Sequence, residues 1–271
     1  MNPEQNVVVV SSLTEYIDIV LKNKKFLSDN GDKRILLYRG HPNENFTLTP
    51  SVFRDGFISY ETDLVCELSR IAPEEFSPTM SPLDKLIKMQ HYGLPTRLLD
   101  VTLNPLVALF FACENEDVNG EIFSIPEYVR YANDTQVDLY AELSIIDEKN
   151  LEETLSKKLS KTDLKEEFKD HYLPIMARQN NNRIKRQQGA FLLFGLDTEN
   201  QDFPKTKSTI DEKPFLQEKQ EDGIDFIIKV PKESKFKLLE QLDSIGINRS
   251  LLFPELEHQS RYLKEKFAIR N

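Results

Sequence analysis

The segment from Gln90 to Thr102 holds the densest group of side chains that could do chemistry. It contains six such residues within thirteen positions: Gln90, His91, Thr96, Arg97, Asp100 and Thr102. A continuously apolar stretch, 105–112, follows almost at once. A charge carried into a core must be paired or hydrogen-bonded. The segment therefore predicts either a rigid internal brace or the wall of a cavity.

Within this segment, three side chains have definable candidate roles. His91 could serve as a general base or a ligand donor near neutral pH, although a hydrogen-bonded core histidine is the more common case. Arg97 and Asp100 stand three residues apart, which favours an ion pair that braces a tight turn. The alternative is that the same pair holds a ligand.

Arg39 is a second candidate because it follows the apolar run 35–38, which predicts a buried strand. Residues at the point where a chain leaves a sheet often contact ligands. The planar guanidinium suits a phosphate or a carboxylate, and Gly40 permits close backbone approach or a positive φ. A structural ion pair of Arg39, for example with Asp100, is the equally weighted alternative.

Gln188 directly precedes another buried-strand candidate, 189–194. It could face the same cavity as the residues above and orient a ribose or an attacking group. Arg183 and Arg186 lie just before it and could form a small anion-binding rim, although a solvated basic helix face is the more common explanation of such a cluster.

Several common enzyme and metal classes find no support in the chain. The four histidines are scattered without metal-ligand spacing, so no metal site is predicted. Cys66 and Cys113 make no disulfide framework and predict buried free thiols. Glu255 and Glu257 have the spacing of a transferase acidic pair, but acidic residues are favoured at a helix start in any case. There is no P-loop, nucleophile elbow or Rossmann glycine fingerprint.

The candidate residues need a scaffold, and hydrophobic periodicity predicts an α+β one. Helices are expected at 12–28, 57–71, 82–90, 104–114 and 232–245, with Ser81 and Asn104 as N-caps before prolines. Strands are expected at 7–10, 35–38, 120–126, 137–146, 189–194 and 225–230, with helix as the alternative at 137–146. The Lys/Glu-rich stretch 148–170 predicts a charged helical insertion, and 197–221 a polar surface loop. We therefore expect one compact domain over 1–271, with a mixed or antiparallel central sheet and flanking helices.

Composition limits the partners and the location of the protein. At 39% hydrophobic and 30% charged residues, the chain is typical of soluble globular proteins. The net charge of −10 argues against generic nucleic-acid binding, which depends on neutralising phosphates. No apolar run is long enough for a membrane span, and the start lacks the features of a signal peptide, so we expect a cytoplasmic location without membrane contact.

Three groups of motifs resemble the FRG domain family. The first is Tyr38-Arg39-Gly40, and the second is the run from Gln90 to Asp100 followed by the apolar helix that begins at Asn104. The third comprises 187–191, 246–247 and 252–256. Together the resemblance covers a core of about 34–265. Val101 stands where the family often has Trp, and Glu255 where Asp is usual, which bears on packing more than on chemistry.

The resemblance implies bacterial or phage cytoplasmic proteins, some linked to defence or toxin functions. More distantly, the pattern is similar to ADP-ribosyltransferase-like folds, in which an arginine at the end of the first core strand holds NAD. This fold-level analogy implies a cleft that binds a nucleotide-like anion such as NAD, with Arg39, Gly40, Arg97 and Asp100 as binding residues and His91 and Gln188 as catalytic ones. Two functions follow as hypotheses: ADP-ribosyl transfer or NAD cleavage, and a non-enzymatic module that binds a small molecule or a protein in the same cleft.

Overall fold

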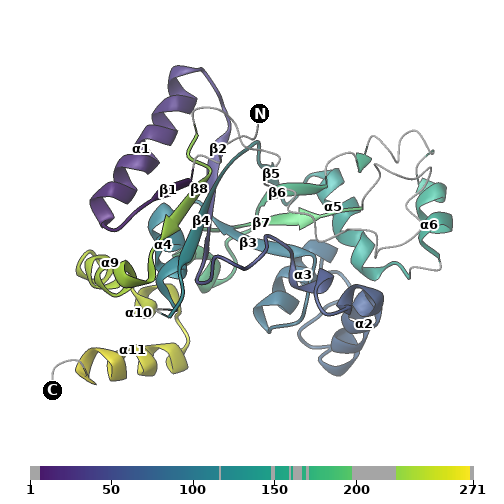
Figure 1. Ribbon diagram of the computed structural model, residues 1–271. Coiled ribbons are helices and arrows are strands. Elements are labelled where there is room, and N and C mark those ends of the chain that lie inside the picture. The colour runs from purple at the N-terminus through teal and green to yellow at the C-terminus, as the bar shows by residue number, and fades with distance from the viewer. Residues whose placement is uncertain are drawn as a thin grey trace.

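The computed structural model describes residues 7–115, 117–147, 150–158, 160, 167–168, 171–196 and 224–268. In this part of the chain, helices flank one eight-stranded mixed sheet with the order β1-β8-β4-β2-β3-β7-β6-β5 (Figure 1). The strands are β1 (Val7–Val9), β2 (Ile35–His41), β3 (Leu98–Thr102), β4 (Gly120–Glu127), β5 (Arg130–Tyr131), β6 (Tyr172–Met176), β7 (Gly189–Phe194) and β8 (Ile227–Val230). The predicted α+β class with a mixed central sheet is confirmed.

The helices divide into two groups along the sheet. One group comprises α1 (Leu13–Asp29), α4 (Pro105–Cys113), α9 (Lys232–Ser244), α10 (Arg249–Leu252) and the C-terminal α11 (Leu256–Ala268). The other comprises α2 (Glu61–Ile71), α3 (Pro82–His91), α5 (Thr135–Glu142) and α6 (Leu151–Lys158), on the right in Figure 1. The short helix α8 (Asn182–Gln187) directly precedes β7. Three 3-10 turns, η1 (Ser51–Phe53), η2 (Phe57–Tyr60) and η3 (Leu143–Ile145), also lie in the described residues. No helix in the described ranges is long and apolar enough to cross a membrane.

Each helix group encloses its own hydrophobic cluster. Leu36 and Tyr38 of β2 pack with α1, α4 and α9, whereas Leu98 of β3 packs with α3 and α5. The opposite face of the sheet forms a third cluster that contains Leu37 and Leu99. Successive side chains of a strand point to opposite faces, so neighbouring positions of β2 and β3 serve different clusters.

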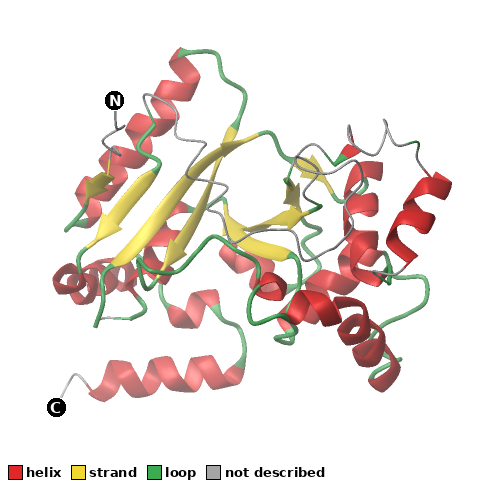
Figure 2. Cartoon of the chain, turned by 45° about the vertical axis from the view of Figure 1, so that its right-hand side comes forward, coloured by secondary structure: helices red, strands yellow, loops and turns green. Residues whose placement is uncertain are grey.

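The sheet is weakly joined at its centre, between β2 and β3. β2 pairs with β4 along its whole length, from Ile35 to His41, but with β3 only at Tyr38 and Thr102. β3 in turn pairs with β7 along its full length. The strands therefore separate beyond the Tyr38–Thr102 pair, and the two parts of the sheet diverge in Figure 2. Residues that follow Tyr38 and precede Thr102 lie at this seam.

Close packing of α4 against β2 and β4 requires glycine. A Cβ on Gly40 would lie 1.9 Å from the backbone oxygen of Ala108, and one on Gly120 would lie 2.2 Å from that of Ala112. The helix itself begins where the sequence predicts, because the Asn104 side chain accepts from the backbone N–H of Leu106 and Pro105 occupies its first turn. α4 is buried along nearly all of its length.

Most other local predictions hold at their elements. Ser81 caps α3 as expected, α1 and α9 lie at the predicted positions, and Gly246 has a positive φ after α9. The structure corrects two others. The stretch 137–145 is helical, and β2 continues to His41, so Arg39 lies inside the strand. The predicted loop 197–221 lies outside the described residues, as does much of the insertion at 148–170.

Candidate functional site

A pocket of about 340 Å³ lies at the seam of the sheet. Its described lining comes from β2 and the turn that follows it, from β3 and β7, from the C-terminal end of α3, from α4 and α8, and from the loop that contains Arg54. A cavity of this size falls at the lower end of the range for small-molecule sites. The elements of both helix groups therefore meet at one open space.

Arg39 reaches the pocket from β2, where it is half-buried. Its Nε donates to Nε2 of His41 at 2.9 Å, and its Nη1 donates to the backbone oxygen of Asp100 on β3. This bond bridges the two strands where they no longer pair. Burial lowers the pKa of Arg39, the Asp100 carboxylate opposes this, and the nearby Arg54 guanidinium adds to it. Within the described residues, Nη2 of Arg39 has no hydrogen-bond partner.

Arg54 brings a second guanidinium to the same space. It follows η1 and donates through Nε to the backbone oxygen of Thr49 at 3.0 Å, and through Nη2 to the same oxygen. Its Nη1 has no partner in the described part of the chain. Arg39 and Arg54 thus hold like charges close together, and Asp100 supplies the one carboxylate in the described lining.

His41 supports the Arg39 side chain from the same strand. It is 2% exposed, and burial, together with Arg39 and Arg54, lowers its pKa to about 3. The imidazole is therefore neutral at physiological pH. Because Nε2 accepts from Arg39, the proton belongs on Nδ1. Alternation along β2 places His41 and Arg39 on the same side of the strand.

Asp100, His91 and Gln90 supply the other polar groups of the wall. Asp100 is exposed, and no described residue hydrogen-bonds to its carboxylate. His91 ends α3, and its imidazole likewise has no hydrogen bond to a described residue, although its ring contacts Tyr92 with centroids 5.4 Å apart. The Gln90 side-chain oxygen accepts from the Thr96 hydroxyl. The pocket thus exposes a carboxylate and an imidazole that hydrogen-bond to none of the described residues, near two guanidinium groups.

Of the predicted basic rim, α8 contributes one arginine. Arg183 lines the pocket with its guanidinium 4.8 Å from the ring centroid of Phe253. Arg186 instead donates to the backbone oxygens of Ser250 and Leu251, which ties α8 to α10. The rim prediction therefore holds for Arg183 alone.

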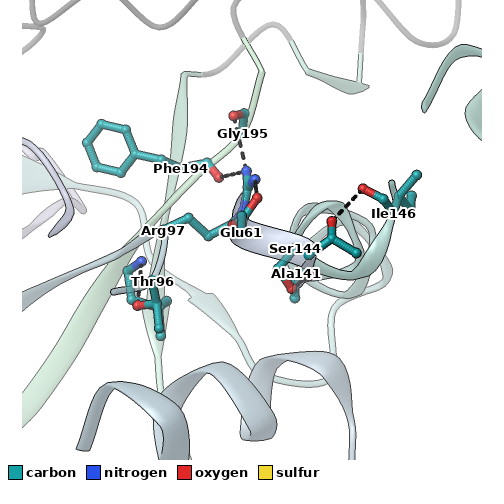
Figure 3. Close-up of polar contacts among 10 residues, drawn as sticks. Glu61, Thr96, Arg97, Ala141, Ser144, Ile146, Phe194 and Gly195 are labelled. Carbon is teal, nitrogen blue, oxygen red and sulfur yellow. Dashed lines mark hydrogen bonds and ion pairs between the residues drawn. The ribbon is translucent and has the colours of Figure 1, made fainter. Parts of the chain in front are cut away.

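Arg97 does not line the pocket, which corrects the predicted Arg97–Asp100 brace. Its side chain is fully buried and forms a two-pronged ion pair with Glu61 at the start of α2, with Nε to Oε1 at 2.8 Å and Nη2 to Oε2 at 2.5 Å (Figure 3). Nη1 donates to the backbone oxygen of Phe194 at 2.9 Å. Asp100 lies within β3 and Arg97 directly precedes this strand, so the two residues are not in a tight turn and their side chains diverge. The brace exists, but its acidic partner is 36 residues away.

Gln188 and Gly40 also have structural roles whose partners the sequence did not reveal. Gln188 has a left-handed φ of +46° and ends α8, its backbone oxygen accepts from the N–H of Leu103 at 3.0 Å, and its side chain is outside the described pocket lining. Gly40 does line the pocket, but the close approach that it permits is that of α4. Glu255 and Glu257 do not line the pocket either. The structure thus gathers Arg39, Gly40, His91 and Asp100 but neither Arg97 nor Gln188.

Sequence reasoning missed Arg54 and His41. Alternation along β2 could have identified His41, since it lies two residues after Arg39 in what proves to be one strand. No local pattern marks Arg54, which lies in an irregular stretch between η1 and η2. Its contribution depends on how the loop folds back on the sheet.

The fold and the site together define an α+β protein with an arginine-lined pocket at an open strand seam. Residues 34–121 match the family model of the FRG domain, which supports the resemblance drawn from Tyr38-Arg39-Gly40 and the Gln90–Asp100 motif. The match includes β2, β3 and α4 and ends before β7 and α9, where the later motifs lie. No curated protein and no solved structure is significantly similar to the chain.

Proposed function

We propose that the pocket binds a nucleotide-like anion, with NAD in the class of ligands that it accepts. The observation that carries this proposal is the convergence of Arg39 and Arg54 in one half-buried space of a chain whose net charge is −10. Each guanidinium keeps N–H groups without a partner in the described part of the chain. Like charges held so close repel each other, and an anion between them would reverse that cost. Planar guanidinium donors match the geometry of phosphate oxygens.

The remaining lining suits the rest of a nucleotide. Phe46, Phe111 and Phe191 give the pocket apolar walls, and Asp100 supplies an acceptor for hydroxyl groups such as those of a ribose. Polar and apolar side chains thus share the described lining of the pocket. These features support a phosphorylated nucleoside better than a bare inorganic ion.

The same groups could support NAD cleavage or ADP-ribosyl transfer. In that reaction the bond between C1′ of the ribose and the nicotinamide nitrogen breaks, and its electron pair leaves with nicotinamide. Water or an acceptor hydroxyl forms the new bond to C1′ and gives its proton to a base. We assign the base role to His91 and the stabilisation of positive charge at C1′ to Asp100, because a carboxylate favours an oxocarbenium-like transition state.

The rival function is a binding module that holds the same ligand without turnover. Incubation of the purified protein with NAD, with release of nicotinamide followed by chromatography and binding followed by calorimetry, separates the two. If the protein is an enzyme, it should release nicotinamide, and this release should be lost in Arg39→Ala. If it is a binding module, it should bind NAD without releasing nicotinamide. Arg70→Ala is the matched control, because Arg70 is an exposed arginine paired with Glu67 outside the pocket.

Arg39 also bridges β2 and β3, so Arg39→Ala could lose its fold. Arg39→Lys keeps the positive charge but not the planar fork of donors, and circular dichroism verifies that either variant is folded. A folded Arg39 variant with wild-type affinity for NAD, or a wild-type protein that binds no NAD, would refute the proposed function.

A further inference from the structure

Phe46 is an apolar side chain that both lines the pocket and is exposed to solvent. It lines the pocket, yet 51% of its surface is exposed. Burial of a phenylalanine side chain stabilises a folded protein, and the fold leaves half of this side chain exposed to solvent. A ring held half-open at the mouth of a cavity is available to a ligand.

The turn that carries Phe46 is firmly anchored. The Phe46 N–H donates to the backbone oxygen of Asn43 at 3.1 Å, and the Glu44 N–H donates to that of Asn119 at 2.9 Å. The Glu44 carboxylate also pairs with Lys229 at 2.9 Å. The backbone that carries Phe46 is therefore held by one hydrogen bond within the turn and by one to the residue that precedes β4.

The Phe46 ring also lies close to the proposed anion site. Its centroid is 6.1 Å from that of the His41 ring, in an edge-to-face arrangement. His41 in turn accepts the 2.9 Å hydrogen bond from Nε of Arg39. The His41 imidazole thus lies between the phenyl ring and the Arg39 guanidinium and contacts both.

We propose that Phe46 stacks on a planar heteroaromatic ring of the ligand whose phosphate is held by Arg39 and Arg54. This inference rests on the proposed function and adds the substrate class: phosphorylated compounds that carry an aromatic base, as opposed to sugar phosphates or free pyrophosphate. A phenyl face stacks on any base. Phe46 therefore distinguishes ligands with a base from those without one and does not select among bases.

Titration calorimetry with ADP-ribose and with inorganic pyrophosphate tests the inference. Stacking of a base on an aromatic side chain is typically worth a factor of about ten or more in affinity. Phe46→Ala and Phe46→Leu should therefore lower the affinity for ADP-ribose by about tenfold or more and leave the affinity for pyrophosphate unchanged. Phe46→Tyr should keep wild-type affinity for both ligands. Phe236→Ala is the matched control, since Phe236 is 45% exposed and lies on α9 outside the pocket lining.

The outcomes separate this inference from the proposed function. Suppose that the wild-type protein binds both ligands. If Phe46→Ala then leaves both affinities unchanged, or lowers the two affinities equally, the stacking is overturned and the anion site stands. Binding of neither ligand to the wild-type protein would overturn both proposals. Retention of ADP-ribose affinity in Phe46→Leu would show that the side chain acts by apolar contact and would also overturn the stacking.

Discussion

Replacement of Arg97 by methionine tests most directly whether the central motif includes a structural brace. In the folded protein Arg97 and Glu61 are 0% and 1% exposed, and their side chains are joined by two hydrogen bonds. Arg97→Met keeps an apolar stem of similar shape but leaves the Glu61 carboxylate buried without its guanidinium. It also removes the donor to the backbone oxygen of Phe194.

The expected loss follows from this geometry. Removal of one partner from a buried ion pair typically costs about 3–5 kcal/mol, and total stabilities are usually about 5–15 kcal/mol. Replacement of both partners by apolar residues is often nearly neutral. The double variant Arg97→Met/Glu61→Leu should therefore be more stable than the sum of the single variants by at least about 2 kcal/mol.

Urea unfolding followed by far-UV circular dichroism measures these free energies, and tyrosine fluorescence gives a second probe because the chain has nine tyrosines and no tryptophan. Arg70→Met is the matched control. Arg70 pairs with Glu67 on the exposed surface of α2, where an ion pair contributes at most about 1 kcal/mol.

Two results would refute the reasoning. One is a loss below about 1 kcal/mol in Arg97→Met, which would equal the surface control. The other is strict additivity of Arg97→Met and Glu61→Leu, since independent residues do not couple. A folded Arg97→Met protein should keep its affinity for ADP-ribose, because Arg97 does not line the pocket.

Three further variants test the seam, the pocket wall and the pH dependence. Gly40→Ala should lose about 1–3 kcal/mol or more in urea unfolding, because the new Cβ would meet the oxygen of Ala108; unchanged stability would contradict the close approach of α4. Asp100→Asn should abolish nicotinamide release but keep ADP-ribose binding in calorimetry, and undiminished release would remove Asp100 from the reaction. Burial raises the pKa of Glu121 to about 7, with Lys229 opposing the shift, so the folded state holds this proton more tightly and stability should fall as pH rises from about 4.5 to 7. Glu121→Gln should make this decrease in the free energy of unfolding smaller by about 1–3 kcal/mol. A pH profile of unfolding that is the same in the variant would contradict the raised pKa of Glu121.

Local signals predicted much of the scaffold. Serine and asparagine caps followed by proline located α3 and α4, and apolar periodicity located α1, α9 and the strands β2, β4 and β7. These signals act between near neighbours, so they can be read directly from the chain. The error at 137–146 has the same origin, since a short apolar stretch fits either a helix or a strand until packing decides.

For the site, the sequence was sufficient to select the β2 arginine and the segment that holds His91 and Asp100. It could not assign partners, because these are chosen by contacts between distant parts of the chain. Arg97 had an acidic residue three positions away, yet the direction of the chain into β3 leads its side chain to Glu61 in the interior. Arg54 enters the pocket only because its loop folds back on the sheet.

The sequence by itself determined the α+β class, the main helix starts and the presence of costly polar groups beside a buried helix. Only the tertiary structure decided which of those groups face a cavity and which are sealed in the core. The physical reason is that helix starts and strand periods depend on neighbouring residues, whereas the pairing of charges depends on which segments meet. At the seam between β2 and β3 that meeting leaves Arg39 open to the pocket, while Arg97 is enclosed with its carboxylate partner.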